Sequence, residues 1–117
     1  MSENEYYLPP CCICRREEPL PAEHYFVYAI ELRNETLVPS GRLVYVGQSW
    51  HTPECRFEQH KSGYKASASV REYGIRLVPE LYFGLNPIIS RNRTAALQAE
   101  ASLAAKLRAD GFVVISS

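Results

Sequence analysis

The sequence predicts an α/β fold, with a small antiparallel β-sheet flanked by helices in the order β-β-α-(α)-β-α-β. Two observations support this fold class. Short runs of β-branched and aromatic residues recur along the chain, and segments of helix-forming composition separate the later runs. The first two runs are joined by a longish loop that contains turn-forming residues, which predicts an antiparallel hairpin.

The composition is that of one ordinary globular domain. The chain has 117 residues, of which 46% are hydrophobic and 22% charged, and this length provides for one core. The longest apolar runs have the length of strands, far short of the ~20 residues that a membrane span needs. The first ten residues have neither the basic region nor the apolar stretch of a secretion signal. We therefore expect a cytoplasmic protein without a membrane partner.

The net charge is zero, but the charges are unevenly distributed. Residues 56–93 contain seven basic and three acidic residues, a net charge of +4, whereas residues 1–24 have a net charge of −3. A basic middle segment is compatible with phosphate binding on one face of the protein. A solvated charged surface would explain the same pattern.

The chain divides into an irregular acidic arm, residues 1–23, and a folded domain, residues 24–117. Four prolines interrupt the arm, and its apolar residues follow no period. An arm of this kind is a candidate docking segment for a protein partner.

The arm also carries a C-x-x-C pair, Cys11 and Cys14, which is half of a zinc site. Cys55, His24 or His51 could complete it with a third ligand. The alternative, which the sequence favours over Zn²⁺, is a set of reduced thiols, because disulfides are rare in a reducing compartment.

The first elements of the domain are a hairpin and a short helix. Residues 25–33 and 42–47 have strand-like composition. Thr52 followed by Pro53 predicts a helix start, since threonine caps helices and proline suits the first helical position. Gly63 is a helix stop. The predicted helix, residues 53–62, places Arg56 and His60 one turn apart on the same face.

The remaining elements follow in alternation. A second short helix is expected over residues 66–73, and a third strand over residues 76–85, where Pro79 indicates an edge or an irregularity. The clearest helix spans residues 94–109, is rich in Ala and Leu, and is followed by Gly111. Residues 112–116 predict the closing strand.

A glutamate lies on the apolar side of this last helix. On a helical wheel Ala96, Ala99, Leu103 and Leu107 share one side, Leu97 and Ala104 widen it, and Glu100 falls inside the arc. A buried carboxylate needs a cation, a hydrogen-bond donor or water. Glu100 is therefore either a structural glutamate at the margin of an apolar face or a ligand of a divalent cation.

Taken in order and with their spacing, these residues resemble the GIY-YIG nuclease domain. "YFVYAI" has Phe26-Val27-Tyr28 where that family has Gly-Ile-Tyr, and "VYVGQS" has Tyr45-Val46-Gly47 for Tyr-Ile-Gly. Arg56 and His60 match the following helix, the segment "HKSGY" is similar as well, and Ala96 with Glu100 matches the late helix. The chain departs from the family in lacking the first glycine, in a longer loop between the tyrosines, and in ending without the asparagine that supports the site.

The resemblance implies a metal-dependent endonuclease that hydrolyses phosphodiester bonds in nucleic acid, with DNA favoured. Tyr45 or Tyr28 would act as general base, Arg56 would bind a phosphate oxygen, and His60 would share a proton or position the water. Glu100 would hold one Mg²⁺ or Mn²⁺. Gly47 would let the chain turn towards the arginine helix. The candidate nucleic-acid contacts are Gly47, Gln48, Lys61, Lys65, Arg71 and Arg93.

Each of these residues also has a simpler interpretation. The two tyrosines could be core residues, Arg56 a salt-bridge partner of Glu100, and His60 a solvent-facing helix residue. The corresponding alternative for the whole chain is a weak or inactive module of this fold that binds nucleic acid or a protein partner. The zero net charge favours that alternative.

Overall fold

The computed structural model describes residues 24–36, 38, 41–63, 66–90 and 92–116. The expected arm, residues 1–23, lies outside the described residues, as does Lys65.

The sheet is built on the predicted hairpin. Strands β1 (His24–Leu32) and β2 (Leu43–Ser49) are antiparallel, in a register that runs from Phe26 opposite Ser49 to Leu32 opposite Leu43. The short strands β3 (Gly74–Leu77) and β4 (Ile88–Ile89) pair antiparallel with β1. The hairpin prediction is therefore confirmed.

The closing strand changes the character of the sheet. Strand β5 (Val113–Ser116) pairs with β2 in parallel, so the five-stranded sheet is mixed and has the order β3-β1-β2-β5, with β4 beside β1. The prediction of a purely antiparallel sheet is wrong in this respect. A helix precedes β5 in the chain. A helical crossover of this kind lets β5 run in the same direction as its neighbour β2.

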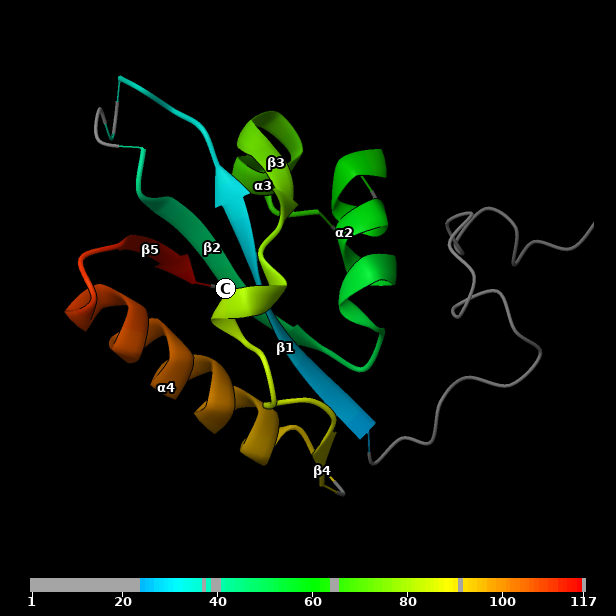
Figure 1. Cartoon of the computed structure of the whole chain (residues 1–117). Coiled ribbons are helices and arrows are strands. Elements are labelled where there is room, and N and C mark those ends of the chain that lie inside the picture. Colours follow the sequence, from blue (N-terminus) through cyan, green and yellow to red (C-terminus); the bar gives the residue numbers. More distant parts are fainter. Residues whose placement is uncertain (1–23, 37, 39–40, 64–65, 91, 117) are drawn as a thin grey trace, which may run out of the picture.

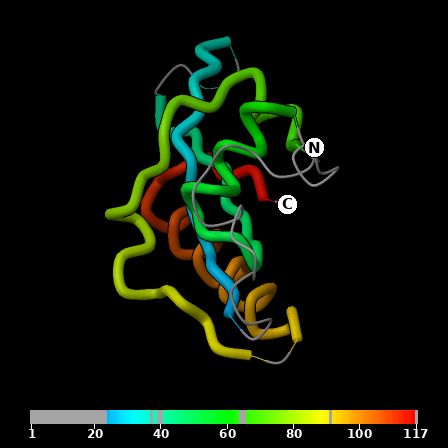
Figure 2. The backbone as a smooth tube through the Cα atoms, turned by 90° about the vertical axis from the view of Figure 1, so that its right-hand side faces the viewer, coloured from blue at the N-terminus to red at the C-terminus, as the bar shows by residue number. Residues whose placement is uncertain are grey.

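Helices cover both faces of the sheet. Helices α2 (Pro53–Ser62) and α3 (Ala68–Tyr73) lie on one side, and α4 (Thr94–Ala109) lies on the other (Figure 1). Figure 2 shows the α2–α3 side towards the viewer. The crossover from β2 to β3 and the crossover from β3 to β5 traverse the sheet in opposite directions. Right-handed connections then place their helices on opposite faces.

The helix ends follow from local signals. The Thr52 Oγ1 atom accepts a hydrogen bond from the Cys55 backbone N–H at 3.3 Å, and Pro53 opens α2. Gly63 closes it with a left-handed φ of 94°, a conformation that glycine adopts without steric cost. The predicted bounds of α2 and α4 are confirmed. Leu97, however, is 51% exposed and does not widen the buried face of α4.

The third strand is shorter than predicted. Strand β3 ends at Leu77, and a 3₁₀ turn, η2 (Pro79–Leu81), replaces the rest of the expected strand. The Val78 N–H still donates to the Ala29 carbonyl at 2.9 Å. Pro79 has no N–H to continue this ladder, so the chain leaves the sheet there.

Two further predictions bear on the whole chain. Within the described ranges, no helix combines the length and the apolar character required to cross a bilayer. Cys55 is fully buried and disulfide-bonded, so the expectation that disulfides are unlikely is wrong for this cysteine.

Candidate functional site

The two motif tyrosines lie on the same face of the hairpin. Tyr28 is opposite Gly47, and Ile30 is opposite Tyr45. Residues two apart on a strand and their cross-strand partners share a face, so both rings point to the side covered by α2. Their ring centroids are 6.3 Å apart, and Tyr28 is only 1% exposed.

Gly47 makes room for this pair. A Cβ atom at this position would lie 2.6 Å from the Tyr28 Oη atom and 3.1 Å from Cε2 of Tyr45. Gly47 lies within β2, so the expected turn at this residue is not present. The chain turns after Ser49, and what the site requires of Gly47 is the absence of a side chain.

His60 joins the two tyrosines from α2. Its Nε2 atom is 3.0 Å from the Tyr28 Oη atom, and its ring meets the Tyr45 ring edge-on with centroids 5.5 Å apart. The Ser67 backbone N–H donates to Nδ1 at 3.0 Å. His60 is 1% exposed, so the interpretation as a solvent-facing helix residue is wrong.

These contacts determine the tautomer of His60. Because Nδ1 accepts a hydrogen bond, the proton of the neutral ring is on Nε2. The His60 Nε2–H group therefore donates to the Tyr28 hydroxyl oxygen. Burial, with a smaller effect of the Arg56 charge, lowers the pKa of His60 to about 4, and the ring is neutral at pH 7.

The Tyr28 hydroxyl is held in its protonated form by burial. Burial and the neighbouring Tyr45 raise the pKa of Tyr28 well above its usual value, and the charge of Glu100 adds a smaller increase. Arg56 opposes this shift through its charge and a hydrogen bond to the hydroxyl. A tyrosine that acts as a base near neutral pH needs a lowered pKa, whereas for Tyr28 the effect of burial outweighs the opposing effect of Arg56.

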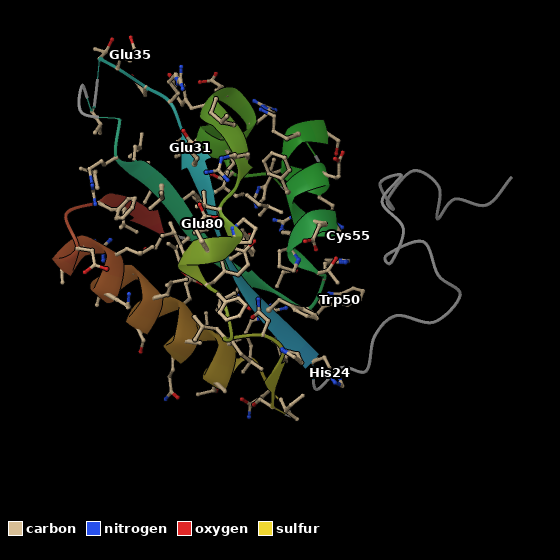
Figure 3. All side chains as sticks on the ribbon, in the orientation of Figure 1. His24, Glu31, Glu35, Trp50, Cys55 and Glu80 are labelled. Carbon is tan, nitrogen blue, oxygen red and sulfur yellow. The ribbon has the colours of Figure 1, made fainter. Side chains whose placement is uncertain are left out.

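Arg56 is held from its other side by Gln59, which the sequence did not indicate, and Gln59 in turn contacts His51, which the sequence offered only as a zinc ligand. Its Nη1 atom donates to Oε1 of Gln59 at 2.9 Å, and Nε2 of Gln59 lies 3.3 Å from Nε2 of His51. Gln59 is 1% exposed. The His51 ring packs against Trp50, and Figure 3 shows Trp50 beside the start of α2.

Glu100 approaches the cluster from the opposite helix. It lies on the buried side of α4 and is 5% exposed, and its charge makes a small contribution to the raised pKa of Tyr28, less than burial or Tyr45. Strand β5 ends where Ser116 pairs with Val46, just before Gly47. The site thus consists of groups from β1, β2 and α2, and the Glu100 carboxylate of α4 acts on it through its charge.

The expected nucleic-acid contacts are more dispersed. Gln48 follows Gly47 and faces the other side of the sheet. The Lys61 ammonium donates to the carbonyls of Arg71 and Gly74, at 3.2 and 3.0 Å, at the end of α3. Arg71 is exposed on α3. The Arg93 guanidinium lies 5.6 Å from the centroid of the Tyr25 ring.

Asn86 is a further residue that the sequence did not single out. Its side chain accepts from the Val27 N–H at 2.9 Å and donates to the Val27 carbonyl at 2.8 Å. The Asn86 side chain thereby satisfies the backbone of β1 next to Tyr28 in the way that a neighbouring strand would. An asparagine in a loop carries no sequence signal of such a distant partner.

The proposed zinc half-site lies outside the described residues. Among the residues that the structure describes, no three His, Cys, Asp or Glu side chains are gathered as ligands for a metal ion.

Comparison with known proteins adds no relative. No protein-family model matches the chain, and neither a curated protein sequence nor a solved structure matches it.

Proposed function

We propose that this protein is a metal-dependent endonuclease of the GIY-YIG type that hydrolyses phosphodiester bonds in nucleic acid, DNA being favoured. The observation that carries the proposal is the cluster of Tyr28, Tyr45 and His60 beside Arg56. It includes a glycine whose missing side chain allows the tyrosine rings to approach the strand.

The proposed reaction assigns one task to each group. Arg56 binds a phosphate oxygen through its planar guanidinium and stabilises the negative charge of the transition state. Tyr28 takes a proton from the attacking water. The phenolate is the acceptor in that step, and the hydrogen bonds from His60 and Arg56 to Oη both favour the phenolate.

Glu100 fits the binding of one Mg²⁺ or Mn²⁺. A carboxylate oxygen is a preferred ligand of both ions, and Mg²⁺ commonly keeps several waters and phosphate oxygens beside one or two carboxylates. A bound divalent cation would neutralise phosphate charge and stabilise the leaving oxygen. Such a cation would also oppose the effect of burial on Tyr28.

One observation favours a second candidate, a module of this fold that binds nucleic acid or a protein partner without cutting. Burial raises the pKa of Tyr28, so that little phenolate exists near neutral pH.

A cleavage assay decides between the two. Supercoiled plasmid, single-stranded and branched DNA would be incubated with Mg²⁺ or Mn²⁺, and with EDTA as the metal-free control. Cleavage is expected with metal, and it should fall at least about 100-fold in Glu100→Ala and in Tyr28→Phe. Glu58→Ala, a change at an exposed glutamate of α2, is the matched control and should leave the rate unchanged.

Two results would count against the nuclease. Folded protein that binds DNA but cuts no substrate would support the binding module. Cleavage that persists in Glu100→Ala would contradict the assignment of the metal ligand.

A further inference from the structure

The contacts behind Arg56 form a chain with a defined direction. A guanidinium only donates hydrogen bonds, so the Gln59 atom facing it must be the carbonyl oxygen Oε1. The Gln59 amide nitrogen then faces His51 at 3.3 Å and donates to Nε2. His51 Nε2 is therefore the acceptor, and the proton of its neutral ring is on Nδ1.

The two residues behind Arg56 in this chain, Gln59 and His51, are each held in place by the fold. Gln59 is 1% exposed on α2, one turn after Arg56. His51 lies in the turn before the helix, where its backbone N–H donates to the Ser49 hydroxyl at 3.0 Å and its ring packs against Trp50 with centroids 3.9 Å apart. The turn after β2 is thereby coupled to the orientation of the guanidinium.

We propose that Gln59 and His51 are positioning residues that hold the Arg56 guanidinium in the orientation in which it binds the scissile phosphate. This inference rests on the proposed nuclease function. A guanidinium carries five N–H donors, so a contact on one side is compatible with phosphate binding on another. Neither Gln59 nor His51 takes part in the chemical step.

The chain of contacts can be tested without any activity. Long-range ¹H–¹⁵N correlation spectra report the tautomer of each of the three histidines. We expect the Nδ1–H tautomer for His51 and the Nε2–H tautomer for His60. In Gln59→Glu, a carboxylate replaces the amide donor beside Nε2, and the pKa of His51 should rise by at least about one unit.

The kinetic test uses Gln59→Leu, which removes both hydrogen bonds but keeps a buried side chain. We expect kcat for DNA cleavage to fall about 10- to 100-fold, because a misoriented catalytic group costs rate, while KM changes less than about threefold. His51→Ala should produce a smaller loss of the same kind. Glu58→Leu, the same exchange at an exposed site of α2, should leave both parameters unchanged.

The outcomes separate the two proposals. An Nε2–H tautomer for His51, or an unchanged pKa of His51 in Gln59→Glu, would overturn the positioning chain even if the protein cleaves DNA. Unchanged kcat in folded Gln59→Leu would overturn it as well. If the wild-type protein cleaves nothing, the proposed function fails, whereas the tautomers still report whether the chain of contacts exists.

Discussion

At the scale of residues, the close approach of Tyr28 to Gly47 determines the geometry of the site. The Tyr28 ring lies over the backbone of β2, where any side chain would collide with its hydroxyl end. This position brings Oη within reach of His60 and of Arg56. The contacts that Tyr28 makes with α2 therefore depend on the absence of a Cβ atom at Gly47 on β2.

Gly47→Ala should disrupt this arrangement. Because the added Cβ would lie 2.6 Å from the Tyr28 Oη atom, the ring must move, and we expect a loss of about 1–3 kcal/mol in the free energy of unfolding. Cleavage should be lost with it. Urea denaturation and the plasmid assay measure the two effects.

Gly41→Ala is the matched control, because Gly41 has a φ of 79° and its Cβ would meet nothing within 4 Å. It should cost about 1–2 kcal/mol through the backbone alone and keep the cleavage rate. Equal cleavage rates in the two variants would contradict the role of Gly47.

The sequence predicted some of these residues better than others. Tyr28, Tyr45 and His60 were expected together because the resemblance to the GIY-YIG domain implies one site for them, and the structure brings them into contact. The sequence did not single out Gln59, and it offered His51 only as a possible zinc ligand. Gln59 is a polar residue on a polar helix, and His51 lies in a turn. The two side chains meet only because the folded chain places that turn against α2.

At the scale of elements, α2 presents Arg56 and His60 because of where it begins. Thr52 caps the helix and Pro53 opens it, so Arg56 falls in the first turns, close to the end of β2. These signals lie within a few residues of the helix, which is why its bounds were predictable. The parallel pairing of β5 with β2 depends on contacts between distant segments, and the sequence pattern carries no comparable signal for it.

Removing the cap should loosen the part of α2 that carries Arg56. Thr52→Ala deletes the acceptor of the Cys55 N–H and should lower the free energy of unfolding by about 1 kcal/mol. The cleavage rate should fall more than this loss of stability explains at temperatures where the variant is folded. Thr52→Ser, which keeps the hydroxyl, should behave as the wild type in thermal denaturation and in cleavage; a defect as large as that of Thr52→Ala would contradict the capping role.

At the scale of the whole molecule, two histidines of the site make the free energy of unfolding depend on pH. Burial and the Arg56 charge lower the pKa values of His51 and His60 from 6.5 to about 4. Below pH 6.5 the unfolded chain binds protons at both positions that the folded protein does not bind. Their contribution to stability is therefore complete above about pH 6.5 and is lost as the pH falls towards 4.

This loss can be measured by denaturation between pH 4 and 7. For the fully buried His60, the shift from 6.5 to about 4 corresponds to a loss of about 3 kcal/mol in the free energy of unfolding over this range. His60→Gln removes the titrating group. Between pH 7 and pH 4 the free energy of unfolding of this variant should therefore fall less than that of the wild type, by about the contribution of His60. A variant and a wild type whose stabilities fall in parallel would show that His60 is not held neutral.

The most direct test of the central claim is the pH dependence of single-turnover DNA cleavage by the wild type and by Tyr28→Phe. If Tyr28 is the base, the wild-type rate should rise about tenfold per pH unit through the neutral range, because the pKa of Tyr28 is raised and the phenolate is scarce. Tyr28→Phe should lose this dependence together with most of the rate, whereas Tyr73→Phe, a change at an exposed tyrosine, should match the wild type. A Tyr28→Phe variant with the wild-type rate and pH profile would contradict the account.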